Sequence, residues 1–141
     1  MCCMERHELW LYKAEGDLAL AIEALAIPNE KIRDAAIYHT QQAAEKALKA
    51  FLVFKREPLL RTHDLEDLLW ICMKHDISFN YLFRFAAQLN PLIMEYRYPL
   101  EDFDEPQTPL PEELREAIEA ATEVFKFVVD MIATDSVSSK K

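Results

Sequence analysis

The chain has 141 residues, of which 51% are apolar, which suits one domain with a real core. Its formal net charge of −9 disfavours a broad duplex-binding surface but allows a small local basic patch. A single glycine argues against phosphate-cradling loops and β-hairpins, and three cysteines without a CxxC pair argue against a disulfide framework or a zinc site. No apolar run approaches the roughly 20 residues of a membrane span, and the N-terminus lacks the features of a signal peptide, so we expect a soluble, cytoplasmic protein.

Apolar residues at helical spacing predict two helices in the first part of the chain, over residues 5–26 and 31–55. The only glycine, Gly16, lies inside the first of them. Because glycine in a helix interior costs stability, we expect a closely packed neighbouring helix to explain it. A short helix begins near residues 62–64, where Thr, His or Asp could cap its first turn, and it fades at residues 75–76.

The second part of the chain predicts two more long helices. One covers residues 79–96, with Ser78 as its N-cap and a kink or break at Pro91. Three prolines and four acidic residues predict a loop over residues 100–111. A helix over residues 111–133 follows, and residues 135–141 are expected to form a disordered tail.

These elements predict an all-α protein, an up-and-down bundle of four long helices plus one short helix, in a single domain over residues 1–134. No strand alternates convincingly, and there is no internal repeat. Cys72 is expected to be a small core residue, and Cys2 and Cys3 to be disordered. No cofactor and no metal site is predicted.

The second helix has two unlike faces. Small and apolar residues that would let another helix approach closely cover one side: Ala36, Ala43, Ala47, Leu48, Ala50 and Phe51. The complementary arc is polar: Tyr38, His39, Gln42, Glu45, Lys46 and Lys49. The simplest interpretation of this arc is a solvated face on which Glu45 and Lys49 form an i,i+4 pair. The alternative interpretation is a binding surface.

Two short clusters favour the binding surface. THDL, residues 62–65, places His63 beside Asp64 at a helix start, although a histidine there is more often a capping residue than a catalyst. EYRYP, residues 95–99, places Arg97 between Tyr96 and Tyr98. Tyrosine rings can stack on a base, and an arginine can bind a phosphate through two hydrogen bonds.

The combination AxYHxQQAAEKALKA, THDL and EYRYP resembles the HEPN domain family over residues 8–133. The resemblance implies a bundle of four or five helices, commonly a homodimer with its groove near the dimer seam. It also implies nucleotide binding, and for short members a minimal nucleotidyltransferase as partner in a toxin–antitoxin-type module. Many members of the family are metal-independent ribonucleases with an arginine and a histidine four to six residues apart.

The ribonuclease spacing occurs in the chain, but in an unusual place. Five residues separate Arg33 from His39, yet both precede QQAAEKALKA, whereas the family motif usually lies on a later helix. The two side chains would also lie about 120° apart around a regular helix. Arg56 and His63 fit the spacing too, but Pro58 would break a helix between them.

Three hypotheses follow. In the first, a nucleotide-binding module acts with a nucleotidyltransferase, and its pocket would use Tyr38, Gln42, Glu45, Lys46, Lys49, His63, Asp64, Tyr96, Arg97 and Tyr98. In the second, the chain is a dimeric ribonuclease, with His39 or His63 as base and Arg33, Arg97 or Lys46 as cation. In the third, the chain is a helical dimerisation module that associates through its alanine face.

Overall fold

The computed structural model describes residues 3–92 and 108–139 and confirms the all-α class. Its elements in chain order are α1 (Arg6–Leu25), α2 (Glu30–Phe54), α3 (Leu65–His75), the 3₁₀ helix η1 (Ile77–Leu82), α4 (Phe83–Leu92) and α5 (Pro111–Ser139). Within these residues there is no strand, and no helix is long and apolar enough to cross a bilayer.

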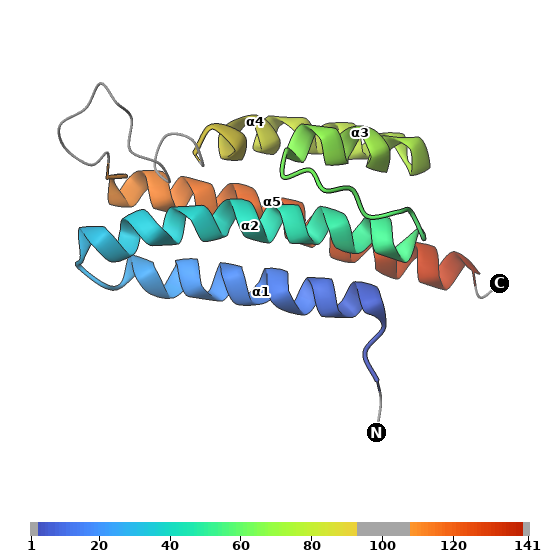
Figure 1. The fold of residues 1–141 in the computed structure, drawn as a ribbon, viewed down its shortest axis with the longest axis horizontal. Helices are drawn as coiled ribbons and strands as arrows, with labels where there is room; N and C mark the ends of the chain where they lie inside the picture. Colours follow the sequence, from blue (N-terminus) through green and yellow to red (C-terminus); the bar gives the residue numbers. More distant parts are fainter. Residues whose placement is uncertain (1–2, 93–107, 140–141) are drawn as a thin grey trace.

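Helix α2 lies at the centre of the bundle and contacts α1, α3, α4 and α5. Figure 1 shows α1, α2 and α5 side by side along the long axis, with α3 and α4 on the side of α2 opposite α1. The predicted alanine face of α2 is buried inside this arrangement, since Ala43, Ala47 and Ala50 are each 0% exposed. The face therefore packs against the chain's own helices, so the expectation that it joins two molecules is wrong.

Side-chain caps fix three helix starts. The side chain of Asn29 accepts a hydrogen bond from the backbone N–H of Lys31 at the start of α2, and that of Asp64 accepts one from Glu66 at the start of α3. Asp64 is thus the cap among the three predicted candidates. Asp76 in turn accepts hydrogen bonds from the hydroxyl and from the backbone N–H of Ser78, so the prediction of Ser78 as N-cap is wrong. These two hydrogen bonds, above all that of the hydroxyl, hold the pKa of the Asp76 carboxyl below its usual value.

The third and fourth segments differ in detail from the prediction. A 3₁₀ helix precedes α4, and Pro91 lies within α4, one residue from its end. Residues 93–107 are outside the described part of the chain, and they include Tyr96, Arg97, Tyr98 and most of the predicted acidic loop.

Helix α5 continues to Ser139 through most of the segment expected to be a disordered tail. An ion pair between Lys55, at the end of α2, and Asp135 holds this last part of the helix against the bundle. The sequence pattern did not indicate it, because the two residues are eighty positions apart.

Two further predictions concern single residues. Cys72 is confirmed as a core residue: it is 0% exposed, and burial raises the pKa of its thiol to about 12. Gly16, in contrast, has no neighbour, since a Cβ built on it would meet nothing within 4 Å. The expected close helix beside Gly16 is therefore absent from the described chain.

Helix α2 ends in a Schellman motif that has an arginine where glycine is usual. The backbone N–H of Arg56 donates to the carbonyl of Val53 (3.0 Å) and that of Glu57 to the carbonyl of Leu52 (2.9 Å). Arg56 accordingly adopts a positive φ of 62°. A side chain with a Cβ is disfavoured in this left-handed conformation by roughly 1–2 kcal/mol.

We expect Arg56→Gly to have a free energy of unfolding about 1 kcal/mol higher than Arg56→Ala. Both substitutions remove the same side chain beyond Cβ, so their difference isolates the backbone strain. Urea denaturation followed by circular dichroism measures it. Equal midpoints for the two variants would contradict this account of the α2 terminus.

Candidate functional site

A row of polar side chains on α2 is buried inside the bundle. Gln41, Glu45 and Lys49 follow one another at intervals of four residues and are 0%, 4% and 7% exposed. The other members of the predicted polar arc are half-buried. The interpretation of this arc as an ordinary solvated face is therefore wrong, because neighbouring elements cover it.

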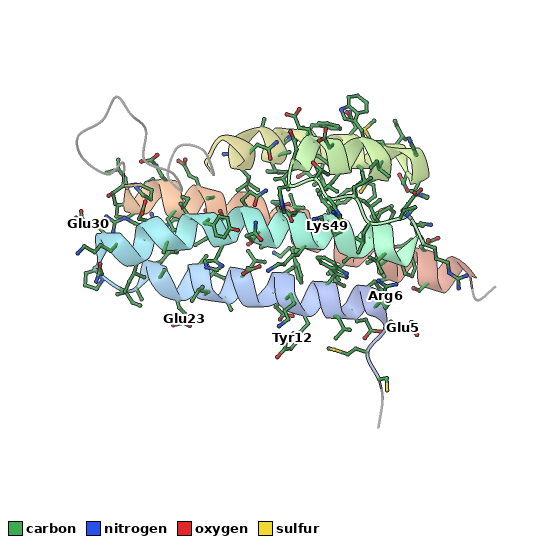
Figure 2. All side chains as sticks on the ribbon, in the orientation of Figure 1. Glu5, Arg6, Tyr12, Glu23, Glu30 and Lys49 are labelled. Atoms are coloured by element: carbon green, nitrogen blue, oxygen red, sulfur yellow. The ribbon has the colours of Figure 1, made fainter. Side chains whose placement is uncertain are left out.

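Glu45 is the centre of the first polar cluster. Its Oε2 accepts a hydrogen bond from Lys49 Nζ at 3.0 Å, and both of its carboxylate oxygens lie 3.2 Å from His63 Nδ1. Lys49 Nζ also lies 5.9 Å from the centroid of the Trp10 ring on α1, within cation–π range. The cluster thus joins α1, α2 and the segment before α3, and Lys49 lies inside the bundle (Figure 2).

His63 connects the buried row to solvent. Its side chain is 74% exposed, whereas that of Glu45 is 5% exposed. Gln41 Nε2 donates to the backbone carbonyl of His63 at 2.9 Å, which fixes the main chain at this position, and Gln42 Nε2 donates to Gln41 Oε1 at 3.1 Å. Nδ1 of His63 faces both carboxylate oxygens of Glu45, to which a protonated Nδ1 would donate, and Nε2 has no partner among the described residues.

A second carboxylate, Asp17 of α1, holds two further polar residues of the arc, His39 and Lys46. Its Oδ1 lies 2.9 Å from His39 Nδ1, and its Oδ2 accepts from Lys46 Nζ at 2.7 Å. The Asp17 side chain is 12% exposed, so this network pins α1 to α2. The structure therefore divides the single predicted pocket into two clusters, with Lys46 and His39 in one and Lys49 and His63 in the other.

Tyr96, Arg97 and Tyr98 lie outside the described residues, and the predicted site residues that remain within them have structural partners. Arg33 Nε donates to the backbone carbonyl of Pro109 at 2.6 Å, which ties α2 to the segment before α5. Arg33 and His39, the pair with the ribonuclease spacing, thus have different partners in the chain. Asp64 Oδ1, besides capping α3, accepts from Asn90 Nδ2 at 3.1 Å. The Tyr38 ring packs edge-on against His39, with centroids 5.7 Å apart.

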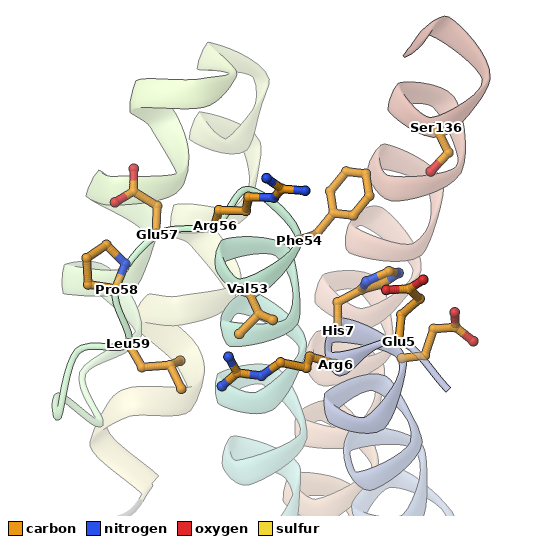
Figure 3. Close-up of a pocket in the computed structure, with 11 residues that line it drawn as sticks. Glu5, Arg6, His7, Val53, Phe54, Arg56, Glu57, Pro58, Leu59 and Ser136 are labelled. Carbon is orange, nitrogen blue, oxygen red and sulfur yellow. The ribbon is translucent and has the colours of Figure 1, made fainter. Parts of the chain in front are cut away.

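A cavity of about 970 Å³ lies at the end of the bundle where α1 begins and α5 ends (Figure 3). None of the predicted site residues lines it. Its ionisable side chains are of both signs: Glu5, Arg6, His7, Glu8, Arg56 and Glu57. This mixture defines no single class of ligand, so the Glu45 cluster remains the stronger candidate.

Sequence reasoning missed three residues of the two clusters. Gln41 could have been found, because it precedes Glu45 and Lys49 at the same interval of four. Asp17 and Trp10 gave no signal, since their positions on α1 reveal their role only after α1 packs against α2. The described residues thus form a helical bundle in which the buried carboxylate of Glu45 contacts the exposed imidazole of His63.

The chain belongs to the HEPN domain family, whose sequence profile matches residues 7–132. The crystal structure of an archaeal HEPN homologue has the same fold, with a TM-score of 0.71 and 24% sequence identity over 92% of this chain and 99% of that one. No functionally curated protein matches the chain. The resemblance drawn from the sequence is thereby confirmed at the level of family and fold.

Lys49→Ala should lower the free energy of unfolding by about 3 kcal/mol, because it leaves the Glu45 carboxylate buried without its lysine. The double variant Glu45→Leu/Lys49→Leu should recover most of that loss, because it removes both buried charges. Urea unfolding of the three proteins measures the difference. If the double variant were as unstable as Lys49→Ala, packing rather than charge would explain the effect.

Proposed function

We propose that the chain is a nucleotide-binding HEPN protein that acts with a minimal nucleotidyltransferase, in a toxin–antitoxin-type module. The ligand site is the cluster of Glu45, Lys49 and His63. The observation that carries this proposal is the exposed imidazole of His63, held at Nδ1 by a buried carboxylate. Family membership supports it, because the resemblance to short HEPN proteins implies both the ligand class and the partner.

Energetics favour a functional role for this cluster. Burying a carboxylate and an ammonium costs desolvation free energy, and an apolar pair of similar volume is often at least as stabilising. Glu45 and Lys49 nevertheless lie almost completely inside the bundle. We attribute their presence to the orientation of His63, whose backbone Gln41 fixes as well.

The chemistry around His63 suits a phosphate-bearing ligand. A protonated imidazole would donate from Nε2 to a phosphate oxygen, while Glu45 retains Nδ1. Lys49 offsets the charge of Glu45, so the carboxylate does not repel an anion strongly. The half-buried Trp10 ring beside Lys49 offers an aromatic surface on which a base could stack.

Calorimetric titration with ATP tests the binding site. Wild type should release or absorb heat, and His63→Ala should bind at least roughly tenfold more weakly, a loss of about 1.4 kcal/mol. His75→Ala is the matched control, because His75 also contacts a glutamate, with Nε2 2.7 Å from Glu57 Oε1, but lies elsewhere. No heat at millimolar ATP, or equal weakening by the two variants, would count against the site.

The nucleotidyltransferase partner needs a separate test. Co-expression of the chain with a small nucleotidyltransferase encoded beside it should give a complex on size exclusion. The absence of such a neighbouring gene would remove the basis for this part of the proposal and leave the ligand site untouched.

A metal-independent ribonuclease is the second candidate, favoured by the same carboxylate–histidine pair. Glu45 orients His63 so that Nε2 could accept the proton of an RNA 2′-hydroxyl. Cleavage of single-stranded RNA in excess chelator should then be lost in His63→Ala and retained in His39→Ala, because His39 is engaged by Asp17. Equal trace activity in both variants and in wild type would indicate contamination and exclude the ribonuclease.

A further inference from the structure

The side chain of Asn90, on α4, makes two hydrogen bonds to the segment that carries His63. Its Oδ1 accepts the backbone N–H of Leu65 at 3.1 Å, and its Nδ2 donates to Asp64 Oδ1 at 3.1 Å. Asn90 is half-buried and lies in the last turn of α4, 25 residues from Leu65 in the sequence. One amide therefore ties the end of α4 to the start of α3.

The two polar atoms of this amide match what the start of α3 offers. The N–H of Leu65 needs an acceptor, and the carboxylate of Asp64 needs donors. The backbone N–H of Glu66 supplies one donor to Asp64 Oδ1 at 2.8 Å, and Asn90 supplies another. An alanine at position 90 would remove both hydrogen bonds of the amide. An aspartate there would keep the acceptor for Leu65 but place a second carboxylate beside Asp64, where like charges repel.

Asn90 can fix its partners because α4 is itself anchored in the core. Leu89, which precedes it, is 0% exposed, and Ala86, one turn earlier, is 1% exposed. Helix α4 packs against α2, α3 and α5, and it lies on the same side of α2 as α3 does (Figure 1). A side chain on such a rigid element holds a neighbouring segment more precisely than a side chain on a loop does.

His63 is therefore held from two helices. On the side of α2, Gln41 Nε2 donates to the backbone carbonyl of His63 at 2.9 Å, and Glu45 lies 3.2 Å from its Nδ1. On the side of α4, Asn90 fixes the two residues that follow His63. A distance of 3.2 Å is at the long end of the hydrogen-bond range, so a backbone shift of roughly 0.5 Å at His63 would break the contact with Glu45.

We propose that Asn90 sets the orientation of the His63 imidazole. It is a positioning residue, because it acts through the backbone of Leu65 and the carboxylate of Asp64, and none of its hydrogen bonds to the described chain involves the imidazole itself. Its link to ligand binding rests on the proposed function, which places the ligand at His63. A change at the end of α4 would then reach the ligand site through one side chain.

The tautomer of His63 in the free protein tests this inference by nitrogen-15 magnetic resonance. At a pH where the imidazole is neutral, wild type should carry its proton on Nδ1, facing Glu45. Asn90→Ala and Asn90→Asp should move the proton toward Nε2, which a solvated histidine prefers, whereas a loss of stability alone would leave the tautomer unchanged. Gln88→Ala is the control, because Gln88 is an exposed amide on the same helix, and it should keep the proton on Nδ1. Circular dichroism should show that all three variants are folded.

A proton on Nε2 in wild type, an unchanged tautomer in both Asn90 variants, or an equal change in Gln88→Ala would overturn the inference. Titration with ATP then tests the link to the ligand. Asn90→Ala should bind ATP roughly fivefold more weakly, as expected for the loss of one hydrogen bond, and Gln88→Ala should bind it as wild type does. If wild type binds no ATP, or if ATP affinity stays the same while the tautomer moves, the proposed function fails and the positioning of His63 by Asn90 stands.

Discussion

The carboxylate of Glu45 sets the strongest constraint on this bundle. It lies on the central helix with almost no access to water, and an isolated charge in that position would cost far more free energy than a small domain has to spare. It must therefore have partners, and Lys49 and His63 supply them at 3.0 and 3.2 Å. Since His63 belongs to the segment before α3 and Lys49 contacts Trp10 of α1, satisfying one charge fixes three parts of the chain around α2.

Asp17 of α1 is the partner of two other polar side chains of α2. His39 and Lys46 of the polar arc are both half-buried, and Asp17 binds the two together. The polar arc thus joins neighbouring helices through ion pairs and hydrogen bonds and is not a solvated surface. His63 is the exception, because most of its side chain remains exposed while its Nδ1 is held. A group that is both oriented and accessible is what a ligand site needs, which is why we place the site there.

Signals from residues close together in the sequence were enough to predict the bounds of the first two helices. Periodicity and helix-breaking residues located α1 and α2 to within one residue at each end. The alanine face was correctly expected to admit a second helix, but this helix belongs to the same chain and not to another molecule. Apart from the cap at Asp76, two residues before the predicted Ser78, the main errors arose where residues distant in the sequence decide the outcome. The ion pair between Lys55 and Asp135 holds the end of α5 against the bundle. Lys46 forms an ion pair with Asp17, which was not among the predicted site residues. Glu45, Lys49 and His63 were all among the predicted site residues, but their burial depends on the packing of α1 and α3, which a single helix pattern does not contain.

The ligand site proposed at His63 lies at the start of α3. Figure 1 places α1 and α3 on opposite sides of α2, so the outer face of α1 and the start of α3 are separate parts of the surface. Glu45 holds Nδ1 of His63, and Lys49 on the same helix holds Glu45. The orientation of this imidazole therefore follows from the packing of α2 against the segment before α3, which is why one buried carboxylate can prepare an exposed side chain for binding.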